Sequence, residues 1–231
     1  MAAANDTTKT TADGGEGAAA TAGAGEATFP ADHPSPLFGK IMFWGLIVWV
    51  LGYCGVLLGA FSVQFLEGEF PCPLCMVQRY AMILSSLAAL WMIMQARRGQ
   101  LTPLRYAQGL GMAIVAAILG SWESTRQILL HIKPGDPGYG GAVLGMHLYT
   151  WALITFVIVI LYCGVALILA PAAVPIAPKH GIGSILTMVV VWLFIAVVAA
   201  NVVAIIFLEG FAWVLPDDPT SYNLIDQLTG K

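Results

Sequence analysis

"IMFWGLIVWVLGYCGVLLGAFSVQFL", residues 41–66, decides the fold of this chain, because no charged residue interrupts it. A bilayer core about 30 Å thick is crossed by about 20 helical residues that rise about 1.5 Å each. The stretch is therefore long enough to span a membrane. Its apolar character is continuous, whereas a strand of a membrane barrel alternates apolar and polar residues. We therefore predict a transmembrane helix, which satisfies its own backbone hydrogen bonds in lipid.

Four further uncharged stretches predict four further spans, at residues 80–96, 106–122, 146–170 and 182–208. The second and third spans along the chain are short, and they reach full length when polar residues at their ends extend toward the membrane surface. Only 10% of the residues are charged, against about 25% in a soluble domain. The composition therefore excludes a soluble protein and predicts an all-α membrane protein: a four-helix transmembrane bundle followed by a fifth, C-terminal transmembrane helix.

Basic residues in the connecting segments predict the orientation of the spans. One side of the membrane carries Lys9, Lys40, Arg97, Arg98, Arg105 and Lys179, and the other side carries Lys133 and Lys231. Loops rich in Lys and Arg stay in the cytoplasm. We therefore expect a cytoplasmic N-terminus, with the loop that follows the first span, the 129–146 loop and the C-terminal segment all outside the cytoplasm.

Composition also divides the chain into segments. Residues 1–37 are rich in Ala, Gly and Thr and contain no apolar run of signal-peptide length, which is typical of a disordered cytoplasmic tail. Residues 38–172 hold the four-helix core, and residues 173–208 hold a connector and the fifth helix. Residues 209–231 form an outward-facing segment with several acidic and apolar residues. This segment is either a cap over the outward face or a loose tail.

Between the first two spans lies "FPCPLCMVQRY", residues 70–80, which contains two cysteines two residues apart. Pro71 and Pro73 prevent the first helix from continuing, so the second helix is predicted to begin near Leu74 or Cys75. Cys72 and Cys75 then lie at the outer membrane surface, close to a helix N-terminus whose partial positive charge favours a thiolate. A Cys-X-X-Cys pair in such a place is typical of a reactive disulfide.

Arg79 lies four residues after Cys75, one helical turn further on the same face. An arginine inside or at the rim of the hydrocarbon region costs a few kcal/mol and needs a compensating partner. Two partners are consistent with this position. The guanidinium can stabilise a thiolate at Cys75, or it can donate to a carbonyl oxygen of a lipid-soluble redox molecule on the same face.

Zinc binding and an inert pair are the two alternatives for the cysteine pair. A structural zinc site needs four ligands, but His131 and His147 do not have ligand-like spacing to the pair. The other two cysteines, Cys54 and Cys163, fall within spans, where they are expected to pack as small apolar residues. Redox chemistry at the pair is therefore predicted, with no metal site.

The pattern Cys72-Pro-Leu-Cys75-x-x-x-Arg79, placed after one span and opening the second, resembles the DsbB family of disulfide-forming membrane oxidases. The resemblance covers roughly residues 40–170. It implies a protein of the cytoplasmic (inner) membrane that oxidises thiols outside the cytoplasm and passes their electrons to a quinone, ubiquinone or menaquinone. It also implies a soluble DsbA-like partner with a thioredoxin fold, and no nucleic-acid partner. By this resemblance Cys75 contacts the quinone, Arg79 binds its carbonyl, and Cys72 exchanges disulfides with outside thiols.

A second segment, "GSWESTRQILLH" at residues 120–131, resembles the family's other quinone-contact region. In family members a His follows the Glu there, whereas here Ser124 follows Glu123. The resemblance makes Glu123, Ser124 and Arg126 candidate quinone contacts, together with Gln78 beside Arg79. Alternatively, Glu123 and Arg126, which are three residues apart on one helix, simply pair near the surface.

The chain also departs from the family. DsbB proteins carry a second cysteine pair between their third and fourth helices, but "HIKPGDPGYGGAVLGMHLY" at residues 131–149 contains no cysteine. Either the partner's thiolate reaches Cys72 directly, or another protein carries the relay disulfide. Two rival functions stay open: a reductase that delivers electrons outward, and a non-catalytic scaffold or assembly factor with a vestigial cysteine pair.

Overall fold

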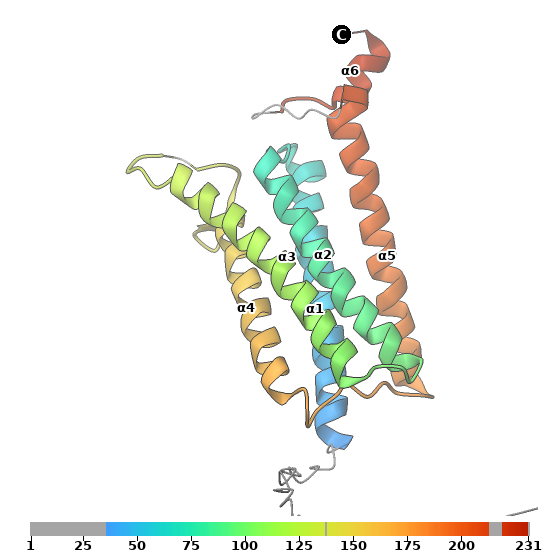
Figure 1. Cartoon of the computed structure of the whole chain (residues 1–231). Coiled ribbons are helices and arrows are strands. Elements are labelled where there is room, and N and C mark those ends of the chain that lie inside the picture. The colour runs from blue at the N-terminus through green and yellow to red at the C-terminus, as the bar shows by residue number, and fades with distance from the viewer. Residues whose placement is uncertain (1–35, 137, 213–218, 231) are drawn as a thin grey trace, which may run out of the picture. The chain divides into compact units, whose positions relative to one another are not determined.

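The computed structural model describes residues 36–136, 138–212 and 219–230. Within them, five helices are long and apolar enough to cross a membrane. Figure 1 shows how they are arranged. They are α1 (Pro36–Ser62), α2 (Pro73–Arg97), α3 (Pro103–Leu130), α4 (Leu148–Leu169) and α5 (Ile182–Glu209). The predicted all-α membrane protein with five spans is confirmed. The predicted cytoplasmic tail, residues 1–37, falls almost wholly outside the described residues.

The second and third helices are longer than the uncharged stretches that predicted them. Each begins at a proline, Pro73 for α2 and Pro103 for α3, because proline suits the first helical position, where its missing N–H would have no partner. Thr102 caps α3, and its Oγ1 accepts from the backbone N–H of Arg105 at 3.2 Å. At the ends near the cysteine pair, both helices continue through charged residues: α2 contains Arg79, which faces α1, and α3 contains Glu123 and Arg126, which pair with each other. The uncharged stretches were therefore shorter than the helices.

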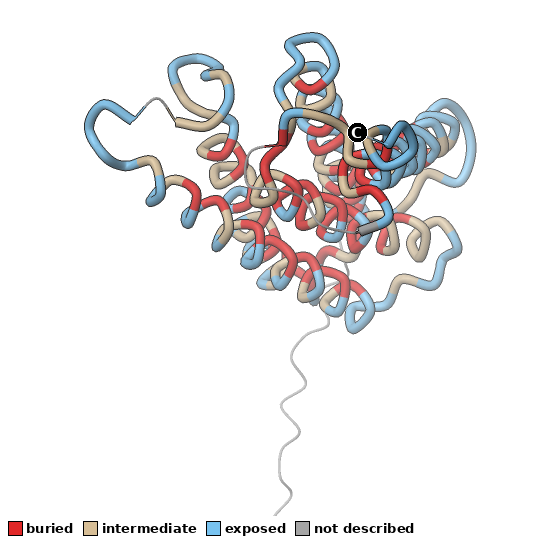
Figure 2. The backbone as a smooth tube through the Cα atoms, turned by 90° about the horizontal axis from the view of Figure 1, so that it is seen from above, coloured by how far each residue is buried: buried red, intermediate tan, exposed pale blue. Residues whose placement is uncertain are grey.

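The helices pack as a bundle in which α3 contacts both α2 and α4, and α1 contacts α2 and α5. Close approach of α3 and α4 depends on Gly120, since a Cβ there would lie 2.2 Å from Cζ of Phe156. Buried residues line the faces that the helices turn toward one another, and exposed ones lie outside (Figure 2). Many of the exposed residues are large and apolar, such as Val115 and Ile118, as a lipid-facing surface requires.

The connection between α3 and α4 contains a small hairpin that the sequence did not predict. Strands β1 (Ala142–Val143) and β2 (Met146–His147) pair antiparallel, with Val143 opposite Met146. Both turn residues, Leu144 and Gly145, have positive φ, at 53° and 78°. This is the backbone of a two-residue type I′ turn. Such a turn usually begins with Asn, Asp or Gly. Because Leu144 stands at this position, the hairpin could not be recognised from the residue types.

The described part of the C-terminal segment packs against the end of the bundle that carries the cysteine pair. It contains the short helix α6 (Asn223–Thr229), which follows η2 (Gly210–Ala212) along the chain. The ring of Tyr222 lies edge-on to Phe70, with centroids 5.0 Å apart, and Leu224 is buried. Gln227 Oε1 accepts from the backbone N–H of Phe211 at 2.8 Å. Residues 219–230 thus make the contacts of a cap beside the loop that carries the cysteine pair.

Candidate functional site

The two cysteines of residues 70–80 meet at the first turn of α2. Cys72 is the N-cap residue, and its Sγ accepts from the backbone N–H of Cys75 at 3.3 Å. The sulfurs lie 2.8 Å apart as free thiols that share a hydrogen bond. The helix begins at Pro73, one residue earlier than the first position predicted. The fixed φ of Pro73 and the cap together hold both sulfurs on the same side of the helix start.

Cys72 is the more protected of the two residues. It is only 6% exposed, whereas Cys75 is half-buried. The pKa of the Cys72 thiol is raised above its ordinary value, because the hydrogen bond to Cys75 Sγ and the burial of Cys72 both favour its protonated form. When the pair loses one proton, the remaining proton therefore stays on Cys72, and the negative charge lies on Cys75.

A buried glutamine from α3 contacts both sulfurs. Gln127 Nε2 lies 3.4 Å from Cys72 Sγ and 3.5 Å from Cys75 Sγ. The orientation of its amide is fixed by Gln78 of α2, whose Nε2 donates to Gln127 Oε1 at 2.8 Å. Because Oε1 is engaged in this way, the NH₂ group faces the sulfurs. An N–H donor at this point stabilises a negative charge on either sulfur.

Arg79, one turn further along α2, is buried and held by α1. Its Nη1 donates to Gln64 Oε1 at 3.0 Å, and its Nη2 donates to the carbonyl oxygen of Ala60 at 3.3 Å. Its Cζ lies 5.6 Å from the centre of the Phe61 ring. Within the described part of the chain, no carboxylate lies within ion-pair distance of Arg79. A buried cation without a counter-charge attracts an anion or a polar ligand strongly.

Gln64 reaches Arg79 from a π-helical turn, η1 (Val63–Glu67), which continues α1. The wider turn directs Gln64 into the bundle, where it is buried. Such turns are frequent at functional sites. Neither Gln64 nor Gln127 was singled out from the sequence. The signal that could have found them is an uncharged amide within a stretch that is otherwise apolar, since polar groups at membrane depth need partners.

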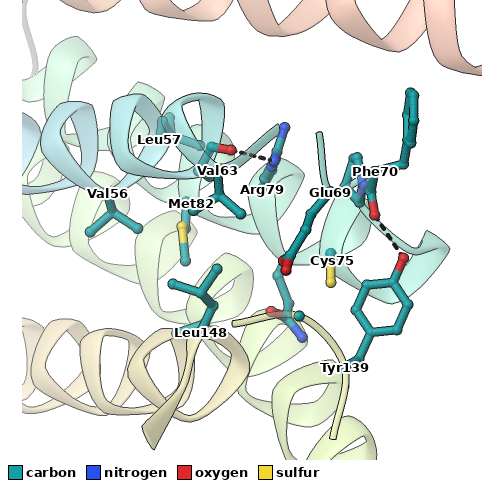
Figure 3. Close-up of a pocket in the computed structure, with 15 residues that line it drawn as sticks. Val56, Leu57, Val63, Glu69, Phe70, Cys75, Arg79, Met82, Tyr139 and Leu148 are labelled. Carbon is teal, nitrogen blue, oxygen red and sulfur yellow. Dashed lines mark hydrogen bonds between the residues drawn. The ribbon is translucent and has the colours of Figure 1, made fainter. Parts of the chain in front are cut away.

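The sulfurs line two different cavities. The Cys75 cavity, shown in Figure 3, measures about 90 Å³ and contains Cys75 but not Cys72. Its wall includes Val56, Leu57, Ala60, Val63, Glu69, Phe70, Gln78, Arg79, Met82, Tyr139 and Leu148. At Val56 it adjoins an apolar groove of about 370 Å³ between α1 and α4. The Cys72 groove, about 510 Å³, contains Cys72 and Gln127 but not Cys75.

The predicted contacts near the end of α3 lie elsewhere. Glu123, Ser124 and Arg126 do not line the Cys75 cavity, whereas the predicted Gln78 does. Arg126 Nη1 lies 3.7 Å from Glu123 Oε2, so these two residues are paired, and their role as quinone contacts stays a prediction. Arg126 also lines the Cys72 groove. Ser124 is buried between helices, with no hydrogen-bond partner for its Oγ among the described residues.

The α3–α4 connection fastens the loop before the cysteines. Tyr139 Oη donates to the carbonyl oxygen of Phe70 at 2.7 Å (Figure 3). The backbone N–H of Gly141 donates to Glu69 Oε2 at 3.1 Å. The approach over residues 67–71 is therefore partly covered. His147 lies away from the sulfurs, with its ring stacked on Tyr149 at 5.2 Å.

Part of this chain, including the cysteine pair, is similar in sequence to known proteins. Residues 42–141, from α1 into the α3–α4 connection, match the model of the family described as disulfide bond formation protein DsbB. A curated relative, disulfide bond formation protein B of Polaromonas naphthalenivorans (strain CJ2), is 32% identical over 87 residues, or 37% of this chain. The chain spans about half the length of that relative, 48%. No solved structure matches the chain.

Proposed function

We propose that this DsbB-like membrane protein is a thiol–disulfide oxidoreductase that supports disulfide bond formation. In this proposal, electrons pass from thiols outside the cytoplasm through the Cys72–Cys75 pair to a quinone. One observation carries the proposal: each sulfur lines its own cavity, and the buried, uncompensated Arg79 lines the cavity of Cys75. A dithiol with separate access for a donor and an acceptor is the arrangement that a relay requires.

The residues around the Cys75 cavity fit a quinone. Arg79 and Gln78 place cationic and amide donors there, which suit a carbonyl oxygen. Val56 and Met82 add apolar walls. Because the cavity is small, the adjoining groove between α1 and α4 is needed to accommodate an apolar tail. When bound, a quinone, ubiquinone or menaquinone, supplies the capacity to accept two electrons and two protons.

Exchange with the donor takes place at Cys72, because this sulfur lines the groove and Cys75 does not. A donor thiolate attacks Cys72 Sγ of the oxidised pair, the Cys72–Cys75 bond breaks, and Cys75 leaves as a thiolate. A second donor thiolate then attacks the donor sulfur of this mixed disulfide, so that Cys72 leaves and takes up a proton. The donor ends as a disulfide. Cys72 and Cys75 take up the two protons that the donor thiols lost, so the pair ends as a dithiol. Two electrons and two protons then remain to be passed on at the Cys75 cavity.

Gln127 and Arg79 assist the departure of Cys75. The Gln127 NH₂ group already lies 3.5 Å from its sulfur, and Arg79 lines the same cavity. A thiolate that leaves easily accelerates exchange.

The Gln127 contact predicts a large kinetic effect. Gln127→Leu removes an N–H donor to a charged sulfur, an interaction of about 1.5–3 kcal/mol. We expect kcat with dithiothreitol as donor to fall by about 10–100-fold. Gln108→Leu, on the exposed face of the same helix, is the matched control and should keep the wild-type rate. Equal rates for the two variants would contradict this role for Gln127.

Basic residues support a cytoplasmic N-terminus, which puts the cysteine pair outside and the protein in the cytoplasmic membrane. In a variant without Cys72 and Cys75, a cysteine at exposed Lys133→Cys should react with a membrane-impermeant maleimide in intact cells. A cysteine at Gln100→Cys should react only after the membrane is opened. The reverse pattern would overturn the orientation.

The function as a whole is tested by turnover of the purified protein with dithiothreitol and a soluble quinone analogue. We expect quinone reduction by the wild-type protein and none by Cys72→Ser. The redox state of the pair in growing cells separates the rival functions. An oxidase keeps the pair mainly as a disulfide, whereas a reductase keeps it mainly as thiols. A scaffold shows no turnover, and Cys72→Ser cells then keep normal disulfides.

A further inference from the structure

We propose that the Cys72 groove is the docking site for an extended segment of the donor protein that carries an acidic side chain beside its reactive cysteine. This inference rests on the proposed function and adds the shape and charge of the donor. It concerns the side of the pair that faces away from Arg79, where Cys72 is the only sulfur among the described residues that line the groove.

The shape of the groove selects an extended segment. Its walls come from the start of α2, the end of α3 and Tyr139 of the α3–α4 connection, and its volume of about 510 Å³ is within the range of ligand-binding clefts. Cys72 lines this groove and is only 6% exposed. A broad, flat protein surface cannot place a donor sulfur close enough to attack the Cys72–Cys75 disulfide at this buried position. A single extended strand can enter the groove with its cysteine leading.

The donor must be another molecule, because the described part of the α3–α4 connection carries no cysteine. Tyr139 of that connection lines both the Cys72 groove and the Cys75 cavity, and the connection is fastened to the loop before the cysteines. Tyr139 Oη donates to Phe70 O, and the Gly141 N–H donates to Glu69. These bonds hold the connection over the 67–71 loop, so access to Cys72 is by way of the groove between α2 and α3.

The basic residues of the groove favour a donor segment with an acidic side chain next to its reactive cysteine. Among the described lining residues, Arg126 and His131 are basic and none is a carboxylate. His131 is already paired with Asp136 at 3.1 Å. The side chain of Arg126 is 60% exposed, and its ion-pair partner Glu123 is more distant at 3.7 Å and does not line the groove. Arg126 is therefore the group that is available to a donor carboxylate.

Arg126 also favours the reactive form of the donor. A cation beside the groove raises the local concentration of anionic segments and stabilises an incoming thiolate. An acidic side chain next to the donor cysteine would pair with the guanidinium and direct the neighbouring sulfur toward Cys72. Complementary charge of this kind mainly sets specificity and association rate.

Two reduced peptides of equal length, each with a Cys-Gly-Pro-Cys core, test this inference. One is flanked by aspartates and the other by lysines. For each protein variant, kcat/KM with each peptide is divided by that variant's own rate with dithiothreitol, which corrects for any loss of folded protein. The wild-type protein should favour the acidic peptide by about fivefold at low salt, the effect of one exposed ion pair. The preference should disappear at 1 M salt.

Arg126→Glu should abolish or reverse this preference, whereas Arg98→Glu, an exposed arginine at the end of α2, should preserve it. The inference is overturned if the acidic-to-basic ratio is the same in the wild-type protein and in Arg126→Glu, or if the wild-type protein favours the lysine peptide. Failure of the proposed function gives a different result, since the wild-type protein would then not turn over even with dithiothreitol.

Discussion

Cys75→Ser is expected to stop quinone reduction completely and to leave a covalent adduct on Cys72. Without Cys75 the chain cannot form its own disulfide, so no electrons reach the Cys75 cavity. The Cys72 thiolate can still attack the disulfide of an oxidised partner, and one partner sulfur then leaves as a thiolate. No second thiol of this chain is within reach of the mixed disulfide, because Cys54 and Cys163 are buried within α1 and α4. Only the partner's own second thiolate can reverse the adduct, and acid quenching stops that step.

The adduct is measured in the native cells after rapid acid quenching and alkylation. Separation without reductant should show a heavier band for Cys75→Ser that dithiothreitol removes. Cys72→Ser is the matched control and should show no such band, because its remaining sulfur lines the other cavity. If Cys75→Ser forms no adduct and Cys72→Ser cells retain normal disulfides outside the cytoplasm, the scaffold function replaces the oxidase function.

Arg79→Ala is expected to raise the apparent KM for the quinone analogue by about 10–100-fold, since a charge-assisted hydrogen bond contributes about 1.5–3 kcal/mol. Arg79→Lys should restore little of this loss. The guanidinium binds Gln64 Oε1 through one nitrogen and Ala60 O through the other. A single ammonium group cannot hold both acceptors and also present a donor to the cavity.

The effect should be specific to the acceptor side. The KM for dithiothreitol should change less than the KM for the quinone analogue, because Arg79 does not line the Cys72 groove. Arg105→Ala, an exposed arginine near the start of α3, is the control and should keep wild-type kinetics. Wild-type quinone kinetics in Arg79→Ala would show that the arginine has only a structural role.

The parts of the fold that the sequence could predict are those set by local composition. Continuous apolar stretches predicted five helices, and prolines around Cys72 predicted a helix start beside the pair. The same local signal underestimated α2 and α3, because the charged Arg79 and Glu123 ended the uncharged stretches although both lie within the helices. Arg79 is held by acceptors on α1 and η1, and Glu123 pairs with Arg126. A hydropathy pattern contains neither contact.

The rest of the site depends on contacts between residues far apart in the chain. Gln127 reaches Cys75 and Gln78 only because α3 packs on α2. Gln64 faces Arg79 because α1 ends in a π-helical turn, and that turn had no recognised sequence signal. The separation of the two sulfurs into different cavities also arises from packing, since they are only three residues apart in the sequence.

The most direct test of the relay is a single turnover without any donor. Fully reduced protein in detergent is mixed anaerobically with one equivalent of an oxidised quinone analogue, and free thiols are counted by alkylation and mass spectrometry. We expect one quinone to be reduced for each Cys72–Cys75 disulfide formed, with Cys54 and Cys163 unchanged. A quinone that stays oxidised while the Cys72 and Cys75 thiols both remain free would contradict the relay.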